Sequence, residues 1–310
     1  MHVLGNTLLI ANPKAQIGKS GAAARHVEAA LRAALGEESF EVMLTERPGH
    51  AAEIAAHAPG NTNTIIALGG DGVVHEVANG LMRRSREDRP VFAVIPAGSG
   101  NDYALTLGMS MKVGTATRQL LSGKHRPADV GCCNGEYFVE TLSFGLDAAI
   151  ALATVDLREE TGRTGTMLYA QAGIDQVLHH RNPLRYETLL HHVDGRDENL
   201  RLEGESFVFA VQIGPTYGGH FRICPKARFD DGLFDICLAH PPISELSAVA
   251  LFARAKNGWH VGDRRIEMHT ARSLSVRFPV EPPAQLDGER IVGTSFDIEM
   301  HPAALTVITA

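Results

Sequence analysis

The stretch Ile65-Ile66-Ala67-Leu68-Gly69-Gly70-Asp71-Gly72-Val73-Val74-His75-Glu76-Val77 decides how the surrounding chain folds. The apolar run from Thr64 to Leu68 has the length and composition of a buried strand. Beyond the glycines, apolar residues recur at helical spacing (Val73, Val74, Val77, Leu81 and Met82). The pattern predicts a strand that turns directly into a helix.

The turn from Gly69 to Gly72 favours phosphate binding. Glycine lets backbone N–H groups approach a ligand closely, and a helix start supplies donors and a favourable dipole. Asp71 repels phosphate unless a divalent cation or a donor hydroxyl lies between them. The combination indicates nucleotide phosphate chemistry with Mg²⁺. The alternative is a tight strand-to-helix turn in which Asp71 caps the helix.

The first part of the chain repeats this strand-then-helix order. Four strands are expected, at 7–11, 40–44, 64–68 and 91–95. They predict a parallel sheet with helices on both faces, whose ligands lie at the carboxyl ends of the strands. Asn12, Thr45, Asp71 and Ser99 follow those ends. The loop 12–21 is a second candidate phosphate loop, although it lacks the first glycine of a P-loop.

After Gly123 the pattern changes to short strand-like segments, one of them at 137–142, separated by turns such as Asn134-Gly135. Helices are expected within this part at 166–179 and 244–256. We therefore predict an α/β nucleotide-binding domain over 1–125 and a mostly antiparallel β-sandwich over 126–290.

Composition narrows the choice of partner and compartment. Acidic residues exceed basic ones by seven, which argues against a nucleic-acid partner bound through bulk charge and against docking through a polybasic segment. No apolar run approaches the roughly 20 residues needed to span a bilayer. The first residues lack the pattern of an export signal, and the four cysteines show no CxxC spacing. A cytoplasmic location is expected.

Several short motifs occur in a defined order along the whole chain. They are Asn12-Pro13, Thr45 with Gly49-His50-Ala51, Gly69-Gly70-Asp71-Gly72 with Glu76, Asn79 and Gly80, Pro96 through Ala104, Phe144 through Ala148, Asp231 through Asp235, and Leu286-Asp287-Gly288-Glu289. In this order and spacing, the chain resembles the bacterial diacylglycerol kinases and sphingosine kinase-like lipid kinases over essentially its full length.

The resemblance implies transfer of the ATP γ-phosphate to a lipid hydroxyl, with ATP in a cleft and a last segment, about 291–310, that returns to the first domain. Asp71 would act through Mg²⁺, and Asp287 or Glu289 would accept the hydroxyl proton, with Asp287 slightly favoured of the two. The residues implied at the nucleotide are Asn12, Thr45, Gly69, Gly70, Asp71, Gly72, Val73, Val74, His75, Glu76, Gly98, Ser99 and Asn101.

The resemblance also implies a second Mg²⁺ site, remote from the chemistry. It would use the Asp231 side chain with main-chain carbonyls at Arg228 and Leu233. The partners implied are ATP and a lipid acceptor, with transient contact at a membrane surface, and homodimer formation is left open. A plain hairpin turn is the alternative for Asp287-Gly288-Glu289.

The chain departs from the family pattern at Val73, where Thr is usual, and at His75, where Asn is common. These departures place ATP affinity and acceptor identity in question. The alternatives are an NAD kinase, which shares the Gly-Gly-Asp-Gly turn, a kinase for a soluble alcohol, and a non-catalytic nucleotide- or lipid-binding protein.

Overall fold

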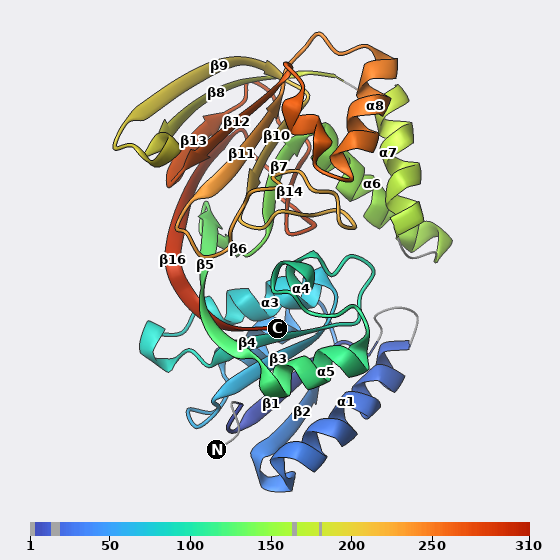
Figure 1. The fold of residues 1–310 in the computed structure, drawn as a ribbon, viewed down its shortest axis with the longest axis vertical. Coiled ribbons are helices and arrows are strands. Elements are labelled where there is room, and N and C mark those ends of the chain that lie inside the picture. The colour runs from blue at the N-terminus through green and yellow to red at the C-terminus, as the bar shows by residue number, and fades with distance from the viewer. Residues whose placement is uncertain (1–3, 14–18, 163–165, 180–181) are drawn as a thin grey trace. The chain divides into compact units, whose positions relative to one another are not determined.

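The computed structural model describes residues 4–13, 19–162, 166–179 and 182–310, which form two compact units. Unit 1 comprises Met1–Val130 and Ala303–Ala310, and unit 2 comprises Gly131–Pro302 (Figure 1). The limits of the units, next to Val130 and Ala303, fall within two strands, β5 (Lys124–Cys133) and β16 (Ser295–Thr309), so no turn residues mark them.

Unit 1 is built on a parallel sheet. Its strands are β1 (Thr7–Ala11), β2 (Phe40–Leu44), β3 (Thr64–Gly69) and β4 (Val91–Pro96), in the order β2-β1-β3-β4. The end of β16 continues the sheet, with Val307 paired in parallel with Phe92. Strands β1 and β3 are buried throughout, which explains why both read as unbroken apolar runs.

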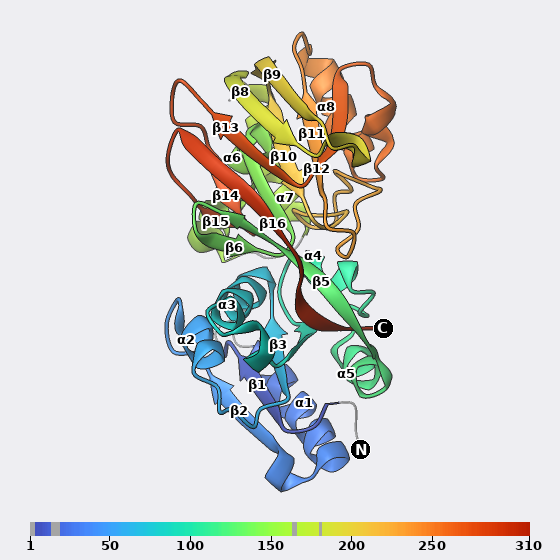
Figure 2. The same ribbon diagram turned by 90° about the vertical axis from the view of Figure 1, so that its left-hand side faces the viewer.

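Helices cover both faces of this sheet (Figure 2). Helices α2 (His50–Ala56) and α3 (Asp71–Met82) pack together on one face. Helices α1 (Lys19–Leu35) and α5 (Val113–Ser122) pack together on the other. The short helix α4 (Asp102–Thr106) follows the loop after β4, and 3₁₀ turns lie at Glu37–Ser39 and Arg86–Asp88.

Unit 2 is an antiparallel β-sandwich. One sheet has the order β16-β13-β8-β9 and carries the hairpin of β5 and β6, and the other has the order β12-β11-β10-β7-β14-β15. Phe144 lies in the core between them, with ring centroids 4.8 Å from Phe296 and 5.0 Å from Phe278. The strands not yet given are β6 (Glu136–Phe138), β7 (Thr141–Gly145), β8 (Leu184–His191), β9 (Asn199–Ser206), β10 (Val208–Gln212), β11 (Phe234–Ala239), β12 (Ile266–Ala271), β13 (Ser273–Arg277), β14 (Ala284–Leu286) and β15 (Glu289–Arg290).

Three helices add a second hydrophobic core to unit 2. They are α6 (Leu146–Thr161), α7 (Thr166–His179) and α8 (Glu245–Ala255), and 3₁₀ turns lie at Val193–Gly195 and Trp259–Gly262. Helix α6 was not predicted, because its first turns carry apolar residues on nearly every side and no single apolar face stands out. Within the described residues, no helix is long and apolar enough to cross a membrane. The predicted fold, an α/β unit with a parallel sheet and a mostly antiparallel sandwich, is confirmed.

Candidate functional site

The sheet of unit 1 brings the predicted nucleotide-binding segments to one edge. Ala11 pairs with both Leu44 and Leu68, and Gly69 pairs with Pro96. The residues that follow these strand ends therefore start from one edge of the sheet, as parallel pairing requires. Thr45 is buried there, and its N–H donates to Ala11 O at 2.9 Å. Residues 14–18 of the second candidate phosphate loop lie outside the described residues.

The glycines at this edge serve close packing of backbone on backbone. Gly70 has a φ of −98°, an ordinary value for any residue. A Cβ on Gly98 would lie 2.1 Å from Gly70 Cα, so the loops after β3 and β4 touch directly. Within α3, the N–H groups of Val73 and Val74 both donate to Gly70 O, and these two donors are used inside the helix.

Two carboxylates meet beside these loops. Asp71 accepts hydrogen bonds from the backbone N–H groups of Asn101 (2.8 Å) and Asp102 (2.9 Å) and so holds the start of α4. A Cβ on Gly100 would lie 2.3 Å from Asp71 Oδ2 and 3.4 Å from Asp102 Oδ2. Asp102 is buried and was not among the predicted site residues. Its position next to Asn101 in the Gly-Ser-Gly-Asn-Asp loop was the signal for it.

Mg²⁺ prefers oxygen ligands and often takes one or two carboxylates together with phosphate oxygens and water. Asp71 and Asp102 supply such a pair, and each carboxylate oxygen can accept more than one contact. The donor set of unit 1 therefore fits the ion that the sequence analysis expected.

Other predicted nucleotide ligands have structural partners. The Glu76 carboxylate accepts from the N–H groups of Gly49 and Ala51, both at 2.9 Å, and thereby holds the start of α2. The Asn101 side chain bonds both the N–H and the carbonyl of Gly98 at 2.8 Å. His75 is buried in α3 against Asn79. These side chains therefore help to fix the conformation of the loops at this edge of the sheet.

The Asp287-Gly288-Glu289 segment, in unit 2, is a two-residue hairpin turn between β14 and β15. Asp287 and Gly288 both have positive φ, 49° and 95°, and Leu286 pairs with Glu289. The buried Asp287 carboxylate accepts from the N–H groups of residues 139, 140 and 141 at 2.9–3.0 Å. These three hydrogen bonds, the Asp287 clamp, take up the backbone N–H groups between β6 and β7. The single strand predicted over 137–142 is therefore interrupted. Glu289 is exposed on β15.

The expected second Mg²⁺ site lies in the turn before β11. Asp231 Oδ1 accepts from Leu233 N at 3.1 Å across Gly232. The Arg228 guanidinium pairs with Asp230 at 3.3 Å. Burial and the charge of Asp231 raise the pKa of Asp235 to about 6.

Unit 2 contains an apolar cavity of about 100 Å³ between its second sheet and the helices α6, α7 and α8. Its wall is almost wholly apolar, with Tyr169, Phe221, Phe252 and Leu251 among the larger side chains. Polar side chains reach the wall from Asp147, Tyr217 and His260.

Asp147 is the buried acid of this cavity. The Tyr217 hydroxyl donates to its Oδ2 at 2.5 Å, whereas Oδ1 has no hydrogen-bond partner among the described residues. Burial raises the pKa of Asp147 to about 7, although contacts with Tyr217, Ser143 and the start of α6 act in the opposite direction. Burial likewise lowers the pKa of His260.

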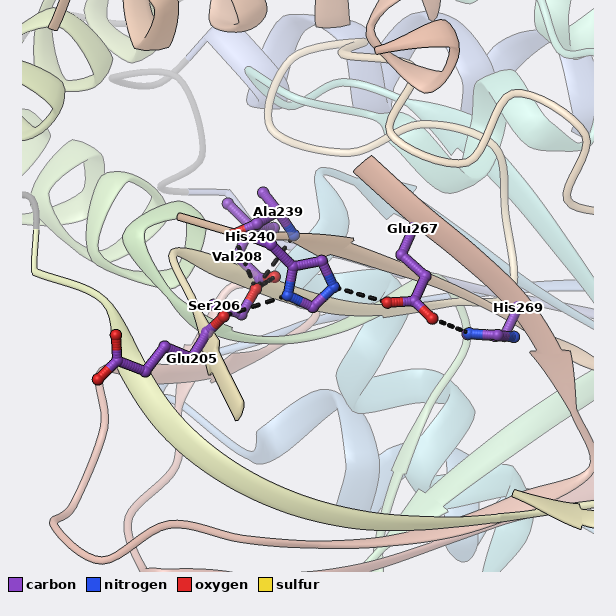
Figure 3. Close-up of polar contacts among 7 residues, drawn as sticks. All are labelled: Glu205, Ser206, Val208, Ala239, His240, Glu267 and His269. Carbon is purple, nitrogen blue, oxygen red and sulfur yellow. Dashed lines mark hydrogen bonds and ion pairs between the residues drawn. The ribbon is translucent and has the colours of Figure 1, made fainter. Parts of the chain in front are cut away.

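A separate row of polar side chains lies along β12 (Figure 3). Glu267 accepts from His240 Nε2 at 2.7 Å and contacts His269 Nε2 at 2.8 Å. Burial acts to raise the pKa of Glu267, but the hydrogen bonds from the two histidines outweigh it and hold that pKa below its usual value. In the part of the chain that the structure describes, no group of three or more His, Cys, Asp or Glu is arranged to hold a metal ion.

Comparisons with known proteins match both units. Residues 6–133 match the diacylglycerol kinase catalytic domain, and residues 140–309 match the YegS C-terminal NAD kinase beta sandwich-like domain. A diacylglycerol kinase of Bacillus subtilis (strain 168) is 31% identical over 243 residues, which cover 77% of this chain and 75% of that protein.

A probable lipid kinase YegS-like of Pectobacterium atrosepticum is 28% identical over 285 residues, 89% of each chain. The crystal structure of a diacylglycerol kinase from Bacillus anthracis str. Sterne has the same fold, with a TM-score of 0.80 and 24% identity over 100% of this chain and 99% of that one. The chain therefore belongs to the family of diacylglycerol kinases and YegS-like lipid kinases.

Proposed function

We propose that this protein uses ATP and Mg²⁺ to phosphorylate a hydroxyl of diacylglycerol or a related lipid. The observation that carries the proposal is the apolar cavity of unit 2, because a kinase for a soluble alcohol has no use for it. The backbone loops and paired carboxylates of unit 1 support the nucleotide half of the reaction.

In this proposal Asp71 and Asp102 hold Mg²⁺, which when bound neutralises charge on the ATP phosphates. Glu289 is the base that takes the proton of the acceptor hydroxyl. Asp287 is the weaker candidate, because its carboxylate already accepts three backbone hydrogen bonds and is buried. Glu289 is exposed and two residues away, on the strand that the Asp287 clamp fixes. Asp287 is thus a positioning residue.

A membrane contact is proposed at helices α7 and α8, which lie side by side (Figure 1). Both helices contribute residues to the cavity wall. Large apolar side chains are exposed on and beside them: Ile174, Leu178, Leu246, Val249 and Trp259. Leu246 is 85% exposed and Trp259 is 66% exposed, which is unusual for such residues on a surface that faces only water. The turn Arg228–Leu233 is retained as the proposed second Mg²⁺ site.

The decisive experiment is a γ-phosphate transfer assay with labelled ATP, Mg²⁺ and mixed micelles of diacylglycerol, monoacylglycerol, ceramide or sphingosine, with NAD and short soluble alcohols in parallel. Label in a lipid supports the proposal, and Asp71→Ala should remove it. Glu87→Ala is the matched control, since Glu87 is an exposed acid of the same unit.

A second candidate function is phosphorylation of NAD, favoured by the likeness of unit 2 to an NAD kinase β-sandwich. Label in NADP would establish it and reject the lipid proposal. Label only in a soluble alcohol would reject the lipid acceptor and retain the kinase.

A further inference from the structure

A row of ionisable side chains joins the two sheets of unit 2 at one edge of the sandwich. We call it the β12 row: His240 follows β11, Glu267 and His269 lie on β12, and Asp194 lies in the 3₁₀ turn Val193–Gly195 between β8 and β9. β12 and β9 are the last strands of their sheets. The β12 row therefore crosses from one sheet to the other where neither sheet has a further strand.

Glu267 and His269 lie on the inward face of β12. Opposite them on β11 are Leu238 and Ile236, which are wholly buried in the core of the sandwich. An inward-facing charge on an edge strand protects that edge from pairing with another molecule. One charged side chain serves that purpose, so the protective role leaves the histidines on both sides of Glu267 unexplained.

The contacts of His240 require both of its ring nitrogens to carry protons. Nδ1 lies 3.1 Å from the carbonyl oxygen of Glu205, whose own carboxylate points away from the ring, and Nε2 lies 2.7 Å from the Glu267 carboxylate (Figure 3). A carbonyl oxygen and an ionised carboxylate only accept hydrogen bonds, and a neutral imidazole has a single N–H. The protonated ring therefore makes one more hydrogen bond here than the neutral ring can.

His269 repeats this arrangement on the other side of Glu267. Its Nε2 lies 2.8 Å from the Glu267 carboxylate, and its Nδ1 lies 3.7 Å from Asp194 Oδ2. Asp194 Oδ1 accepts from Thr270 N at 3.0 Å, so Asp194 also ties the turn to the backbone of β12. A proton on His269 Nδ1 attracts Asp194, whereas a neutral ring that donates to Glu267 presents a lone pair to that carboxylate.

Among the described residues, the ionisable groups that face the β12 row from neighbouring elements are neutral or paired with one another. Tyr186 of β8 faces the row, and burial together with the charge of the row's glutamate raises the pKa of this tyrosine to about 12. Arg265 and Asp263, just before β12, pair at 2.8 Å. His192 and Asp197, on either side of the turn, lie 3.0 Å apart. The charges that balance the two acids of the row are therefore those of its own histidines.

The strands that carry the β12 row also form part of the cavity wall. Ala239 and Ile266 line the cavity and directly precede His240 and Glu267. Successive side chains of a strand point to opposite faces, so the row and the cavity lie on opposite faces of this sheet. His260, in the 3₁₀ turn packed on β12, lies on the cavity side.

We propose that the β12 row is a clasp operated by protons, which holds the turn Val193–Gly195 against β12 at acid pH and releases it as pH rises. In the closed clasp both histidines are imidazolium ions, and each lies between two acceptors. Histidine loses its charge between about pH 5 and pH 8, and each ring then gives up one of its two contacts. Because the folded state favours the protonated rings, their contribution to stability is present at acid pH and falls through this range. The clasp goes beyond the proposed kinase activity and does not depend on it.

The test follows the imidazole nitrogens and one backbone amide of the full chain by NMR. Long-range ¹H–¹⁵N spectra distinguish an imidazolium, with protons on both nitrogens, from either neutral tautomer. His240 and His269 should both be imidazolium ions at pH 5.5 and neutral at pH 8. The protection of the Thr270 N–H against hydrogen exchange, corrected for the intrinsic rate, should fall about tenfold or more over the same range, the effect of one hydrogen bond.

Variants assign the change in protection to the β12 row. His269→Gln should abolish the change at Thr270, because Asp194 then faces a side chain that does not titrate. The amides of β7, at the centre of the same sheet, should keep the pH dependence that they show in the wild type. His179→Gln is the matched control, since His179 pairs with Asp175 at 3.1 Å on α7 of the same unit, and it should leave the change at Thr270 intact.

A neutral ring at pH 5.5 in either His240 or His269 overturns the inference. So does protection at Thr270 that stays constant with pH in the wild type, or that changes with pH equally in the wild type and in His269→Gln. Because the nitrogen spectra and the Thr270 measurement are made on the wild type, they decide the matter even where His269→Gln does not fold.

Discussion

At the Asp287-Gly288-Glu289 turn, two carboxylates two residues apart have opposite surroundings. Removing the charge in Asp287→Asn places an amide among three backbone donors, and we expect a loss of about 1.5–3 kcal/mol in the free energy of unfolding. Glu289→Gln should change that free energy by no more than about 0.5 kcal/mol, because Glu289 is exposed.

Measuring kcat in the same two variants distinguishes a residue that positions the site from one that accepts the proton. Glu289→Gln should lower kcat by about 10²–10⁴-fold, the usual contribution of a general base. Urea unfolding and kcat, measured on both variants, decide the matter. If Glu289→Gln turns over normally and Asp287→Asn is stable but inactive, the two roles are exchanged.

Asp147 gives a second prediction at the residue scale, in the dependence of stability on pH. Burial raises its pKa from 3.8 in the unfolded chain to about 7 in the fold, so the folded state binds more protons between these values. The contribution of Asp147 to the free energy of unfolding is therefore greatest at acid pH and falls as pH rises from about 4 to about 7. The whole effect is on the order of 4 kcal/mol.

Urea unfolding at pH 5 and pH 8 measures this effect. In Asp147→Asn the free energy of unfolding should fall much less between pH 5 and pH 8 than it does in the wild type. The stability of the variant relative to the wild type should therefore be greater at pH 8 than at pH 5. Asp235→Asn should remove a smaller part of this pH dependence of stability, since the pKa of Asp235 rises only to about 6. An unchanged difference between the two pH values in Asp147→Asn would contradict the assignment.

At the scale of the elements, the contact between the loops after β3 and β4 can be tested with one methyl group. In Gly98→Ala the added Cβ would lie 2.1 Å from Gly70 Cα, and only a backbone shift relieves that clash. We expect a loss of about 1–3 kcal/mol in stability and weaker protection by ATP against thermal unfolding. Gly60→Ala is the control, because nothing lies within 4 Å of its Cβ. Equal effects in the two variants would refute the contact.

The helices and strands that could be predicted are those specified by the residue pattern within the element itself. β1 and β3 were predicted because both are wholly buried and read as apolar runs, and α3 because its apolar face repeats at helical spacing. The convergence of their ends follows from parallel pairing alone.

The features that could not be predicted from the sequence depend on contacts between residues far apart along the chain. The split of the strand expected over 137–142 arises from Asp287, almost 150 residues later. The contacts by which Glu76 holds α2 and Asp71 holds α4 join residues that are 27 and 31 positions apart in the sequence. The cavity is assembled from five elements or more, and the sequence pattern gave no sign that Asp147 lies in its wall.

At the scale of the whole molecule, the chain returns to unit 1 at its end. Leu305, Val307 and Ile308 are at most 2% exposed, and Val307 pairs with Phe92 beside the central strands. Arg86 and Arg89 donate to the carbonyls of Ala303 and Ala304 at 2.6 and 2.8 Å. Ala303–Ala310 therefore complete the core of unit 1, and unit 1 should be incomplete without them.

Deleting Ala303–Ala310 removes the large buried side chains of Leu305, Val307 and Ile308, each contributing about 1.5–3 kcal/mol, from a unit of ordinary marginal stability. We expect hydrogen exchange to speed up across β1, β3 and β4, while β10 and β11 in unit 2 keep their protection. Deleting only the exposed Ala310 should leave hydrogen exchange unchanged in the strands of both units. Protection lost equally in both units would mean that they unfold as one, and protection retained in β4 would mean that its pairing with β16 contributes little.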